Sequence, residues 1–379
     1  MKPQKLLRNN RGIALLLTIS VTTILVTAAL ESNRRARFQI VATAAIRDRL
    51  TLSQMAASGV HVAMAMLAKD KKESNQDSLA EDWASPAKIA EILPAMPFDE
   101  GQLAVNITDE MSKIQINALV QFPDSNQFNE PQRTMLDRFL RHISAAAPED
   151  VKMEDDSEPM AIINSIKDWL DSGDDDAITG LSGAESVYYQ GREPPVACRN
   201  GPLPDVNELL QIKGITPEIF YDSEAMSGMH RYLTVYGMNP GEGTTFNFPG
   251  KININTAERP VILALLPSES AEMADALLEY RQQRQEEKET DAFSNPTWYK
   301  GAPGFADVSI DPKLITTTSD VFRIESTATL HDLQLTATAV VERALNDETG
   351  KWGCKILSWQ TDQAKADSQG GTEEPPSSP

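Results

Sequence analysis

The first 70 residues combine a charge-free apolar run with an amphipathic stripe. From Ile13 to Leu30 there are 18 positions without a charge, just enough to cross the hydrocarbon core of a membrane as a helix. Beyond the run, apolar residues recur at the spacings of three and four that mark one face of a helix. These residues are Leu52, Ala56, Val60, Ala63 and Leu67. No proline stands between Pro3 and Pro86. We therefore expect one helix of about 55 residues, half of it in lipid and half packed on a globular head.

Other segments alternate with the two-residue period of β-strands. Residues 322–328 and 333–339 alternate on either side of His331-Asp332, and a further strand over 355–359 follows a turn near 346–350. Residues 103–107 and 114–116 also alternate, and this pattern predicts a hairpin between them. We expect an antiparallel sheet that packs on the long helix.

The middle of the chain has helical periodicity instead. It is strongest over 133–143, 161–170, 206–212 and 259–285. Because strand patterns stand on both sides, we expect a helical domain at 118–315 inserted between strands of the head. The fold class predicted is α+β.

Composition excludes several functions. The 379 residues carry a net charge of −20, whereas sequence-independent nucleic-acid binding needs Lys and Arg to neutralise phosphates. Four His and two Cys exclude a Cys-rich zinc fold and a dense disulfide scaffold. Gly-x-Ser-x-Gly, His-Glu-x-x-His and a phosphate loop are absent from the sequence. We expect no enzyme activity and no nucleic-acid partner.

The N-terminus resembles the type IV prepilin class. Four basic residues and no acid precede Gly12, and the apolar run begins at Ile13. In that class a prepilin peptidase cuts after the glycine and methylates the new N-terminus, which would be Ile13. Most members have Glu at the fifth mature position, where this chain has Leu17. Basic residues before the span place the short end in the cytoplasm, and the head in the periplasm.

An ordered series of motifs narrows the resemblance. The series comprises Ile166–Asp171, Gly183–Glu185, Tyr188-Tyr189, Asn200–Leu203 and Gly250–Ala257. With the leader, it resembles the family of general secretion pathway protein K, the large minor pseudopilin of type II secretion. The similarity covers the leader and most of 160–340. Its acidic loop departs from the usual Asp-x-Asp run of the family, and its C-terminal tail is unusual.

The resemblance implies a domain layout. Residues 1–12 would be the leader, 13–30 the transmembrane helix, 31–117 the first part of a pilin-like head, 118–315 an inserted all-α domain of helix-hairpin-helix or SAM-like type, 316–360 the last strands of the head, and 361–379 a disordered tail. That tail is rich in Ser, Gly, Glu and Pro, a composition that favours disorder.

An acidic loop is the candidate metal site. Six carboxylates fall within 18 residues around a glycine, namely Asp168, Asp171, Asp174, Asp175, Asp176 and Glu185. Hard oxygen ligands on a flexible loop suit Ca²⁺ better than Zn²⁺. The spacing is not that of an EF-hand, so a solvated acidic loop is the alternative reading. Calcium binding in the helical domain of the family favours Ca²⁺, with Asp171, Asp174, Asp175, Asp176 and Glu185 as candidate ligands.

Two further features have alternative readings. Residues 263–281 resemble a helix-hairpin-helix, but Ser268 and Ser270 replace the glycines that present amides to a phosphate, with Glu269 between them. A structural hairpin is therefore expected rather than a DNA site. Cys198 and Cys354 are candidates for a disulfide in an oxidising periplasm, and two free buried thiols are the alternative.

The function implied is assembly. A minor pseudopilin at the tip of the type II secretion pseudopilus would initiate and cap it together with the I- and J-type minor pseudopilins. The major pseudopilin, prepilin peptidase and the inner membrane would be further partners, and secreted substrates or the outer-membrane secretin are candidate contacts. The alternative is a membrane-anchored periplasmic substrate-binding or adhesin-like protein, and a DNA-uptake protein ranks third.

Overall fold

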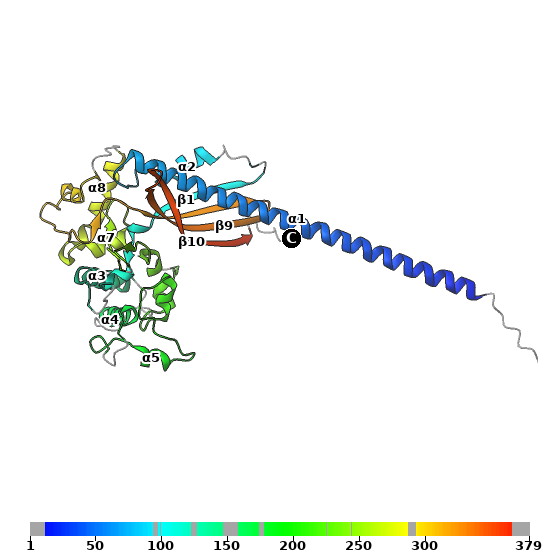
Figure 1. The fold of residues 1–379 in the computed structure, drawn as a ribbon, viewed down its shortest axis with the longest axis horizontal. Helices are drawn as coiled ribbons and strands as arrows, with labels where there is room; N and C mark the ends of the chain where they lie inside the picture. The colour runs from blue at the N-terminus through cyan, green and yellow to red at the C-terminus, as the bar shows by residue number, and fades with distance from the viewer. Residues whose placement is uncertain are drawn as a thin grey trace, which may run out of the picture.

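One long helix joins the apolar N-terminal segment to the head (Figure 1). Helix α1 (Ile13–Glu73) runs for 61 residues without a break, which confirms the continuous helix predicted from the sequence. The computed structural model describes residues 12–93, 98, 100–122, 127–146, 158–173, 178–224, 226–243, 245–286 and 293–365. Of α1, the first half stands clear of the rest of the molecule, and the second half lies along a sheet.

The sheet that α1 covers has four antiparallel strands in the order β1-β8-β9-β10. Their bounds are Gln102–Asp109 (β1), Val321–Leu330 (β8), Leu333–Asn346 (β9) and Lys351–Lys365 (β10). The predicted hairpins are confirmed at β8–β9, where Leu330 pairs with Leu333 across His331-Asp332, and at β9–β10, where Asn346 pairs with Lys351. The sheet and α1 form the first core.

Side chains of α1 fill that core at the predicted positions. Leu52, Ala56, Val60, Ala63 and Leu67 are all buried, and they pack on alternate residues of β8 and β9. Gly59 lets the helix lie close to the sheet, because a Cβ there would overlap the Ser326 and Val105 side chains. Helix α2 (Pro86–Ile92) adds Ile89 to the same core.

The second core lies in the region between β1 and β8. Its helices are α3 (Glu130–Ala146), α4 (Glu158–Leu170), α5 (Ser186–Gln190), α6 (Pro217–Phe220), α7 (Arg259–Leu265) and α8 (Ala274–Glu286). Figure 1 places this helical region at the end of α1 opposite the apolar span. Its buried hydrophobic cluster runs from Ile114 to Ile315, so packing already changes from one core to the other before residue 117.

Short strand pairs accompany these helices, so the inserted region is not purely helical. They are β2 (Ile114–Gln115) with β3 (Leu233–Thr234), β4 (Asn239–Pro240) with β5 (Phe246–Asn247), and β6 (Ile252–Asn253) with β7 (Ile315–Thr316). Pairs β2–β3 and β6–β7 are parallel. These two pairs join distant parts of the inserted region to each other. The fold class is α+β, as predicted.

Two expectations about strands were wrong. Residues 103–107 and 114–116 do not form a hairpin: β1 pairs with β8, and β2 pairs with β3. The Asp109 carboxylate accepts the Met111 amide at 2.8 Å and opens a 3-10 turn at Glu110–Ser112, and this turn carries the chain into the second core. The expected disorder from residue 361 was also wrong for 361–365, because β10 stays paired with β9 as far as Lys365. Residues 366–379 lie outside the described part.

Candidate functional site

The structure brings together part of the predicted acidic loop. Asp168 and Asp171 stand at the C-terminal end of α4, and Glu185 directly precedes α5. Oxygen atoms of these three buried carboxylates lie within 4.8 Å of one another. Asp174, Asp175 and Asp176 lie outside the described residues. Asp168 was not among the predicted ligands, although its three-residue spacing from Asp171 puts both on one face of the helix end.

One ammonium offsets part of this negative charge. Lys167 Nζ lies 2.7 Å from Asp171 Oδ2 and 3.0 Å from Thr179 Oγ1. Asp168 instead accepts the Thr179 amide at 3.1 Å on both oxygens. Burial raises the pKa of Asp171, and the hydrogen bond and charge of Lys167 oppose this rise. Three carboxylates and one ammonium leave a formal charge of −2 in a buried place, where charge is costly.

The donor set fits a hard divalent cation. Asp171 is 6% exposed, and its Oδ1 has no hydrogen-bond partner among the described residues. An orphaned carboxylate oxygen beside two further carboxylates is the arrangement that Ca²⁺ binds with several oxygens at 2.3–2.6 Å. Asp168, Asp171 and Glu185 are therefore the described residues that would hold such an ion.

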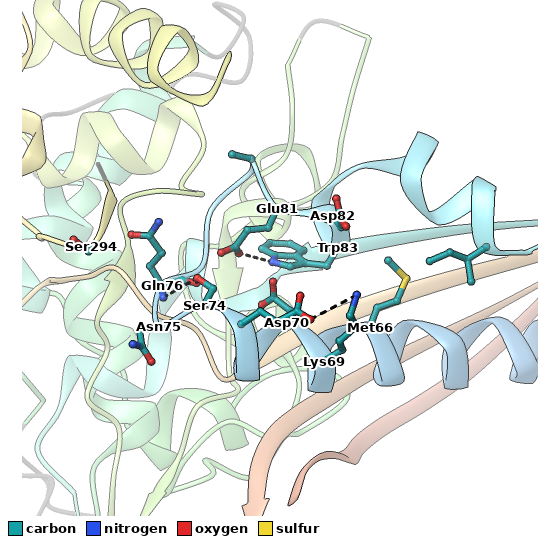
Figure 2. Close-up of a pocket in the computed structure, with 13 residues that line it drawn as sticks. Met66, Lys69, Asp70, Ser74, Asn75, Gln76, Glu81, Asp82, Trp83 and Ser294 are labelled. Atoms are coloured by element: carbon teal, nitrogen blue, oxygen red, sulfur yellow. Dashed lines mark hydrogen bonds and ion pairs between the residues drawn. The ribbon is translucent and has the colours of Figure 1, made fainter. Parts of the chain in front are cut away.

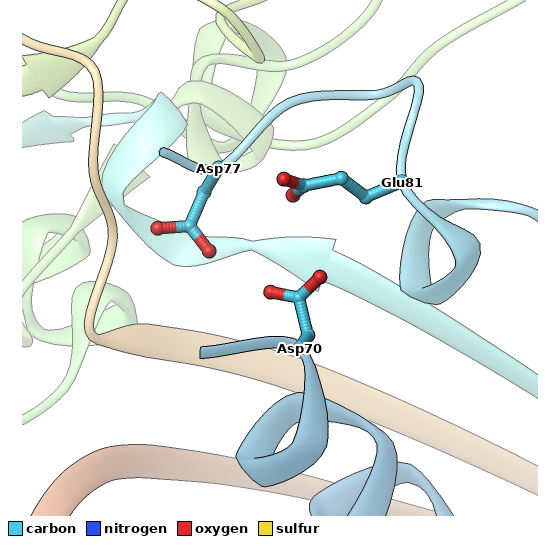
Figure 3. Close-up of side chains that lie close together, drawn as sticks. All are labelled: Asp70, Asp77 and Glu81. Atoms are coloured by element: carbon cyan, nitrogen blue, oxygen red, sulfur yellow. The ribbon is translucent and has the colours of Figure 1, made fainter. Parts of the chain in front are cut away.

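A second acidic cluster, which sequence reasoning missed, lies where α1 ends. Asp70 on α1 meets Asp77 and Glu81 from the following loop, and their carboxylates converge (Figure 3). The cluster borders a pocket lined by Lys69, Ser74 and Gln76, in which Glu81 accepts the Trp83 indole N–H at 2.8 Å (Figure 2). Burial, with Glu81 and Asp77 nearby, raises the pKa of Asp70 to about 7, against the attraction of Arg343.

Arg343 on β9 supplies the positive charge of this second cluster. Its side chain is fully buried, with Nη1 3.1 Å from Asp70 Oδ2 and Nη2 2.5 Å from Asp77 Oδ1. Nη1 and Nη2 also donate to the carbonyl oxygens of Leu67 and Ser319. One guanidinium thus ties the end of α1 and the loop after it to the sheet. Because a buried cation without its partners is strongly destabilising, this contact holds the end of α1 and the following loop against the sheet.

A buried polar network next to it joins the two cores. Asp109 Oδ2, at the end of β1, accepts hydrogen bonds from Asn253 Nδ2 (2.9 Å), Ser319 Oγ (2.6 Å) and Thr256 Oγ1 (2.5 Å). Burial raises the pKa of Asp109 to about 6, and the hydrogen bonds from Ser319 and Thr256 oppose this rise. Asn253 also donates to the Asp77 carbonyl oxygen at 3.0 Å.

Asn255 extends this network into the helical region. Its amide nitrogen donates to the Asp77 carbonyl oxygen at 3.1 Å, and its Oδ1 accepts the Trp298 indole N–H at 2.8 Å. The motif at Gly250–Ala257, singled out in the sequence as a family marker, therefore forms the junction between the helical region and the head.

Of the two alternatives for the cysteines, the disulfide is not formed and the free thiols are confirmed. Cys198 and Cys354 are both free thiols. Cys198 Sγ lies 3.6 Å from the Asp168 carbonyl oxygen in the helical region, whereas Cys354 Sγ lies 3.5 Å from the Met64 carbonyl oxygen beneath α1. They belong to different cores, and burial raises the pKa of each thiol.

The predicted helical hairpin and the Tyr188-Tyr189 motif belong to the packing of the helical region. Helices α7 and α8 form the expected helical hairpin, in which the Ser270 amide donates to the Pro267 carbonyl oxygen at 2.8 Å. Tyr189 is fully buried edge-on against Trp169, with ring centroids 4.7 Å apart. Tyr188 is instead 44% exposed.

The predicted processing position lies at the start of α1. Gly12 directly precedes the helix, Ile13 is its first residue, and residues 1–11 lie outside the described part. Leu17 is exposed on the apolar segment. This segment is the one described helix long and apolar enough to cross a membrane, and none of its apolar window is buried.

Comparison with known proteins shows what the central region of the chain is similar to. Residues 112–236 match the family model described as type II secretion system (T2SS), protein K. This region of the chain is therefore similar to protein K of the type II secretion system. The resemblance seen in the sequence is thereby confirmed.

Whole relatives match over part of their length. The type II secretion system protein K of Klebsiella pneumoniae is 26% identical over 215 residues, which cover 55% of this chain and 60% of the relative. That of Aeromonas hydrophila is 24% identical over 217 residues, or 56% of this chain and 61% of the relative. The alignments thus span about 60% of the length of these relatives.

A solved structure has the same fold. A chain in the crystal structure of the GspK-GspI-GspJ complex from enterotoxigenic Escherichia coli aligns with 85% of this chain and 99% of its own length. The TM-score is 0.55 at 19% identity. This likeness confirms the α+β fold of a long N-terminal helix on an antiparallel sheet with a large helical region.

Proposed function

We propose that this protein is a minor pseudopilin at the tip of a type II secretion pseudopilus, anchored by α1 in the inner membrane with its head in the periplasm. The observation that carries the proposal is the combination of an unpacked apolar helix with a region similar to protein K, inserted between strands of a sheet that packs on that helix. Apolar side chains such as Leu16 (66% exposed) and Ile24 (65% exposed) have no protein cover on α1. A membrane, or the helices of neighbouring subunits, would provide it.

The shape of the head supports a terminal position. Pilin-like subunits stack through their N-terminal helices, each one above the next along the filament. The helical region lies at the end of α1 that is farthest from the span and extends to one side of it (Figure 1), where the head of a following subunit would have to pass. Its core is continuous with the junction at Asp109 and Asn253, so it cannot swing aside without breaking buried hydrogen bonds.

Leu17 supports the same position. In the family pattern, the fifth mature residue is a Glu that neutralises the N-terminal amine of a neighbouring subunit within the membrane. A leucine cannot do so, and an unpaired charge at that depth is costly. A subunit with Leu17 is therefore suited to a place where no further subunit requires that contact. Cleavage after Gly12 and methylation of Ile13 by prepilin peptidase belong to the same proposal.

Calcium at Asp168, Asp171 and Glu185 would stabilise the helical region. The ion would supply two positive charges to a cluster with a formal charge of −2. Asp174, Asp175 and Asp176, which follow α4 in the sequence, are proposed as further ligands. We propose no catalytic role for any residue.

The proposal is tested by isolating the full chain from membranes together with its neighbours. The chain is expressed with the I- and J-type minor pseudopilins of its own system and prepilin peptidase, and purified in detergent through a tag on the head. We expect a complex that contains both neighbours. A chain that purifies alone, while the neighbours form their own complex, would contradict the role in assembly.

A further inference from the structure

A length of α1 between the apolar span and the head has no contact with either core. The first buried side chain of the helix is Leu52, and we call residues 31–51 the stalk. Its last turn reaches the head at Asp48, whose Oδ2 lies 3.9 Å from His331 Nδ1 in the β8–β9 turn. Figure 1 shows α1 extending past the sheet towards its N-terminus with no other helix or strand beside it. At 1.5 Å per residue, the stalk is about 30 Å long.

The stalk differs in charge from the rest of the mature chain. It contains five arginines against two acids, for a net charge of +3, whereas residues 52–379 have a net charge of −27. The arginines are Arg34, Arg35, Arg37, Arg47 and Arg49. A cationic segment between an apolar span and an acidic head indicates an anionic partner close to the span.

When the apolar span crosses a membrane, the length of the helix puts three of these arginines at the depth of lipid headgroups. Arg34 is 21 residues beyond Ile13, which is about 32 Å along the helix, and a hydrocarbon core is about 30 Å thick. At about 100° per residue, Arg34, Arg35 and Arg37 spread over one half of the helix circumference. Phe38 lies between them and is 76% exposed. Aromatic side chains favour this interfacial depth.

The local ion pairs leave positive charge at this point. Arg34 and Arg35 share a single acid: their Nε atoms lie 2.9 and 3.0 Å from the two oxygens of Glu31. Arg37 makes no ion pair with any described residue. With Glu31, Arg34 and Arg35 form a shallow recess that Phe38 also lines. Three guanidinium groups and one carboxylate leave a charge of +2 in less than two turns.

We propose that Arg34, Arg35 and Arg37 bind the phosphates of anionic phospholipids in the bilayer that α1 spans, with Phe38 at the boundary of the acyl chains. Guanidinium groups match phosphate oxygens in two-point geometry. The inference rests on the proposed membrane anchor and adds which lipids surround it and how deeply the helix sits.

The remainder of the stalk separates the acidic head from the anionic headgroups and so reduces the electrostatic repulsion between them. Leu52, where head packing begins, is about 27 Å beyond Arg34. The Debye length at physiological ionic strength is about 8 Å, so repulsion between the head and the headgroups is largely screened at that distance. The arginines attract the surface where they lie, and the stalk holds the −27 head away from it.

The test measures which lipids contact the helix. The full chain is reconstituted in phosphatidylcholine vesicles that contain trace spin-labelled phosphatidylglycerol or spin-labelled phosphatidylcholine, and electron paramagnetic resonance gives the motionally restricted fraction of each. Since a basic residue near the surface is worth ~1 kcal/mol, each uncompensated charge gives about fivefold selectivity for the anionic lipid, and the net charge of +2 gives at least that. We expect selectivity of this order, falling as salt is raised.

A matched pair of variants locates the effect. Arg34→Gln with Arg37→Gln removes two charges at headgroup depth and leaves Arg35 with Glu31, and should abolish the selectivity. Arg47→Gln with Arg49→Gln removes two charges about 20 Å farther along the helix and should leave it unchanged. All four side chains lie on the exposed stalk, so neither variant disturbs a core.

Each outcome decides between separate claims. Equal restriction of both lipids by the unmodified chain overturns the lipid proposal but leaves the membrane anchor intact. The absence of any restricted lipid overturns the anchor itself. If lipids show no selectivity, yet the Arg34/Arg37 variant loses its complex with neighbouring subunits, the partner is an acidic protein surface and the lipid proposal is wrong.

Discussion

Asp70 should make the head less stable as the pH rises through neutrality. Its pKa is raised to about 7 from an ordinary value of 3.8, chiefly by burial and then by the charges of Glu81 and Asp77. Between these two values the folded protein binds more protons than the unfolded chain, so the free energy of unfolding decreases as the pH rises. Above pH 7, Asp70 is charged in both states and the loss is complete.

The size of the effect follows from the shift. A rise of about three units corresponds to ~4 kcal/mol as an upper limit at 1.36 kcal/mol per unit. The carboxylate borders an open pocket, and solvent there screens its interactions, so we expect about half, or ~2 kcal/mol. For a cooperative unit of about 150–250 residues, ~2 kcal/mol corresponds to a change of about 4–8 °C in melting temperature.

The substitution Asp70→Asn isolates this contribution. The amide oxygen can still accept from Arg343 Nη1, which lies 3.1 Å from Asp70 Oδ2, but the repulsion from Asp77 and Glu81 is lost. At pH 4 the variant should have the same melting temperature as the unmodified chain. As the pH is raised towards 8, its melting temperature should exceed that of the unmodified chain by a growing margin. Thermal melts of the full chain in detergent at pH 4, 5, 6, 7 and 8 measure this difference.

Asp347→Asn is the matched control, because Asp347 is exposed in the turn between β9 and β10. Its melting profile should follow that of the unmodified chain at every pH. If Asp70→Asn lowers the melting temperature at pH 8, the charged pair with Arg343 is net stabilising and the reasoning about repulsion is wrong.

Three other changes test separate parts of the account. Gly12→Asp should leave the precursor uncut in cells with prepilin peptidase, and mass spectrometry that finds a mature N-terminus beyond residue 30 would contradict the prepilin assignment. Excess Ca²⁺ should raise the melting temperature of the full chain, because at 100 times the dissociation constant it adds about 2.7 kcal/mol to the free energy of unfolding. Mg²⁺ should be less effective, and Asp171→Asn should remove most of the gain. Identical melts with Ca²⁺, Mg²⁺ and chelator would show that the acidic loop is solvated and binds no ion. Gly59→Val should destabilise the head by several kcal/mol, of the order of other overpacked cores or more, because the new side chain overlaps Ser326; an unchanged melt would show that α1 is not held this close to β8.

Periodic patterns were sufficient to predict the first core. The stripe on α1 and the alternation in β8 and β9 are repeated local signals, and each follows directly from the geometry of a helix or a strand. The two-residue turn at His331-Asp332 was also predicted from the alternation on both sides of it. In the structure His331 has a φ of 53° in this turn. Such features depend on near neighbours in the chain, and the structure confirms them.

Contacts between distant residues could not be predicted in this way. Asp77 and Arg343 are 266 positions apart, and Asn253 is 144 positions from Asp109. No local period reports which polar groups will meet across two cores. The predicted hairpin after β1 failed for the same reason, since Asp109 is held by Asn253, Thr256 and Ser319 at the junction instead of lying within a hairpin.

The acidic loop was predicted in part. Composition pointed to a segment in which Asp171 and Glu185 do meet, while calcium binding there stays a prediction. Asp168 was left out because sequence spacing does not show how the loop folds back on the end of α4, and Lys167 was not recognised as an internal counter-ion. The sequence left open whether the two cysteines pair, and the structure decides for free thiols because each lies in a different core.

The position of the subunit in the filament is the most direct test of the account. Filaments are sheared from cells that overproduce the major pseudopilin and express this chain with a tag on its head, and gold-labelled antibody locates the tag by electron microscopy. We predict one label at one end of a filament, with no label along its length. Labels distributed along the filament would contradict the tip position, whatever the fold of the head.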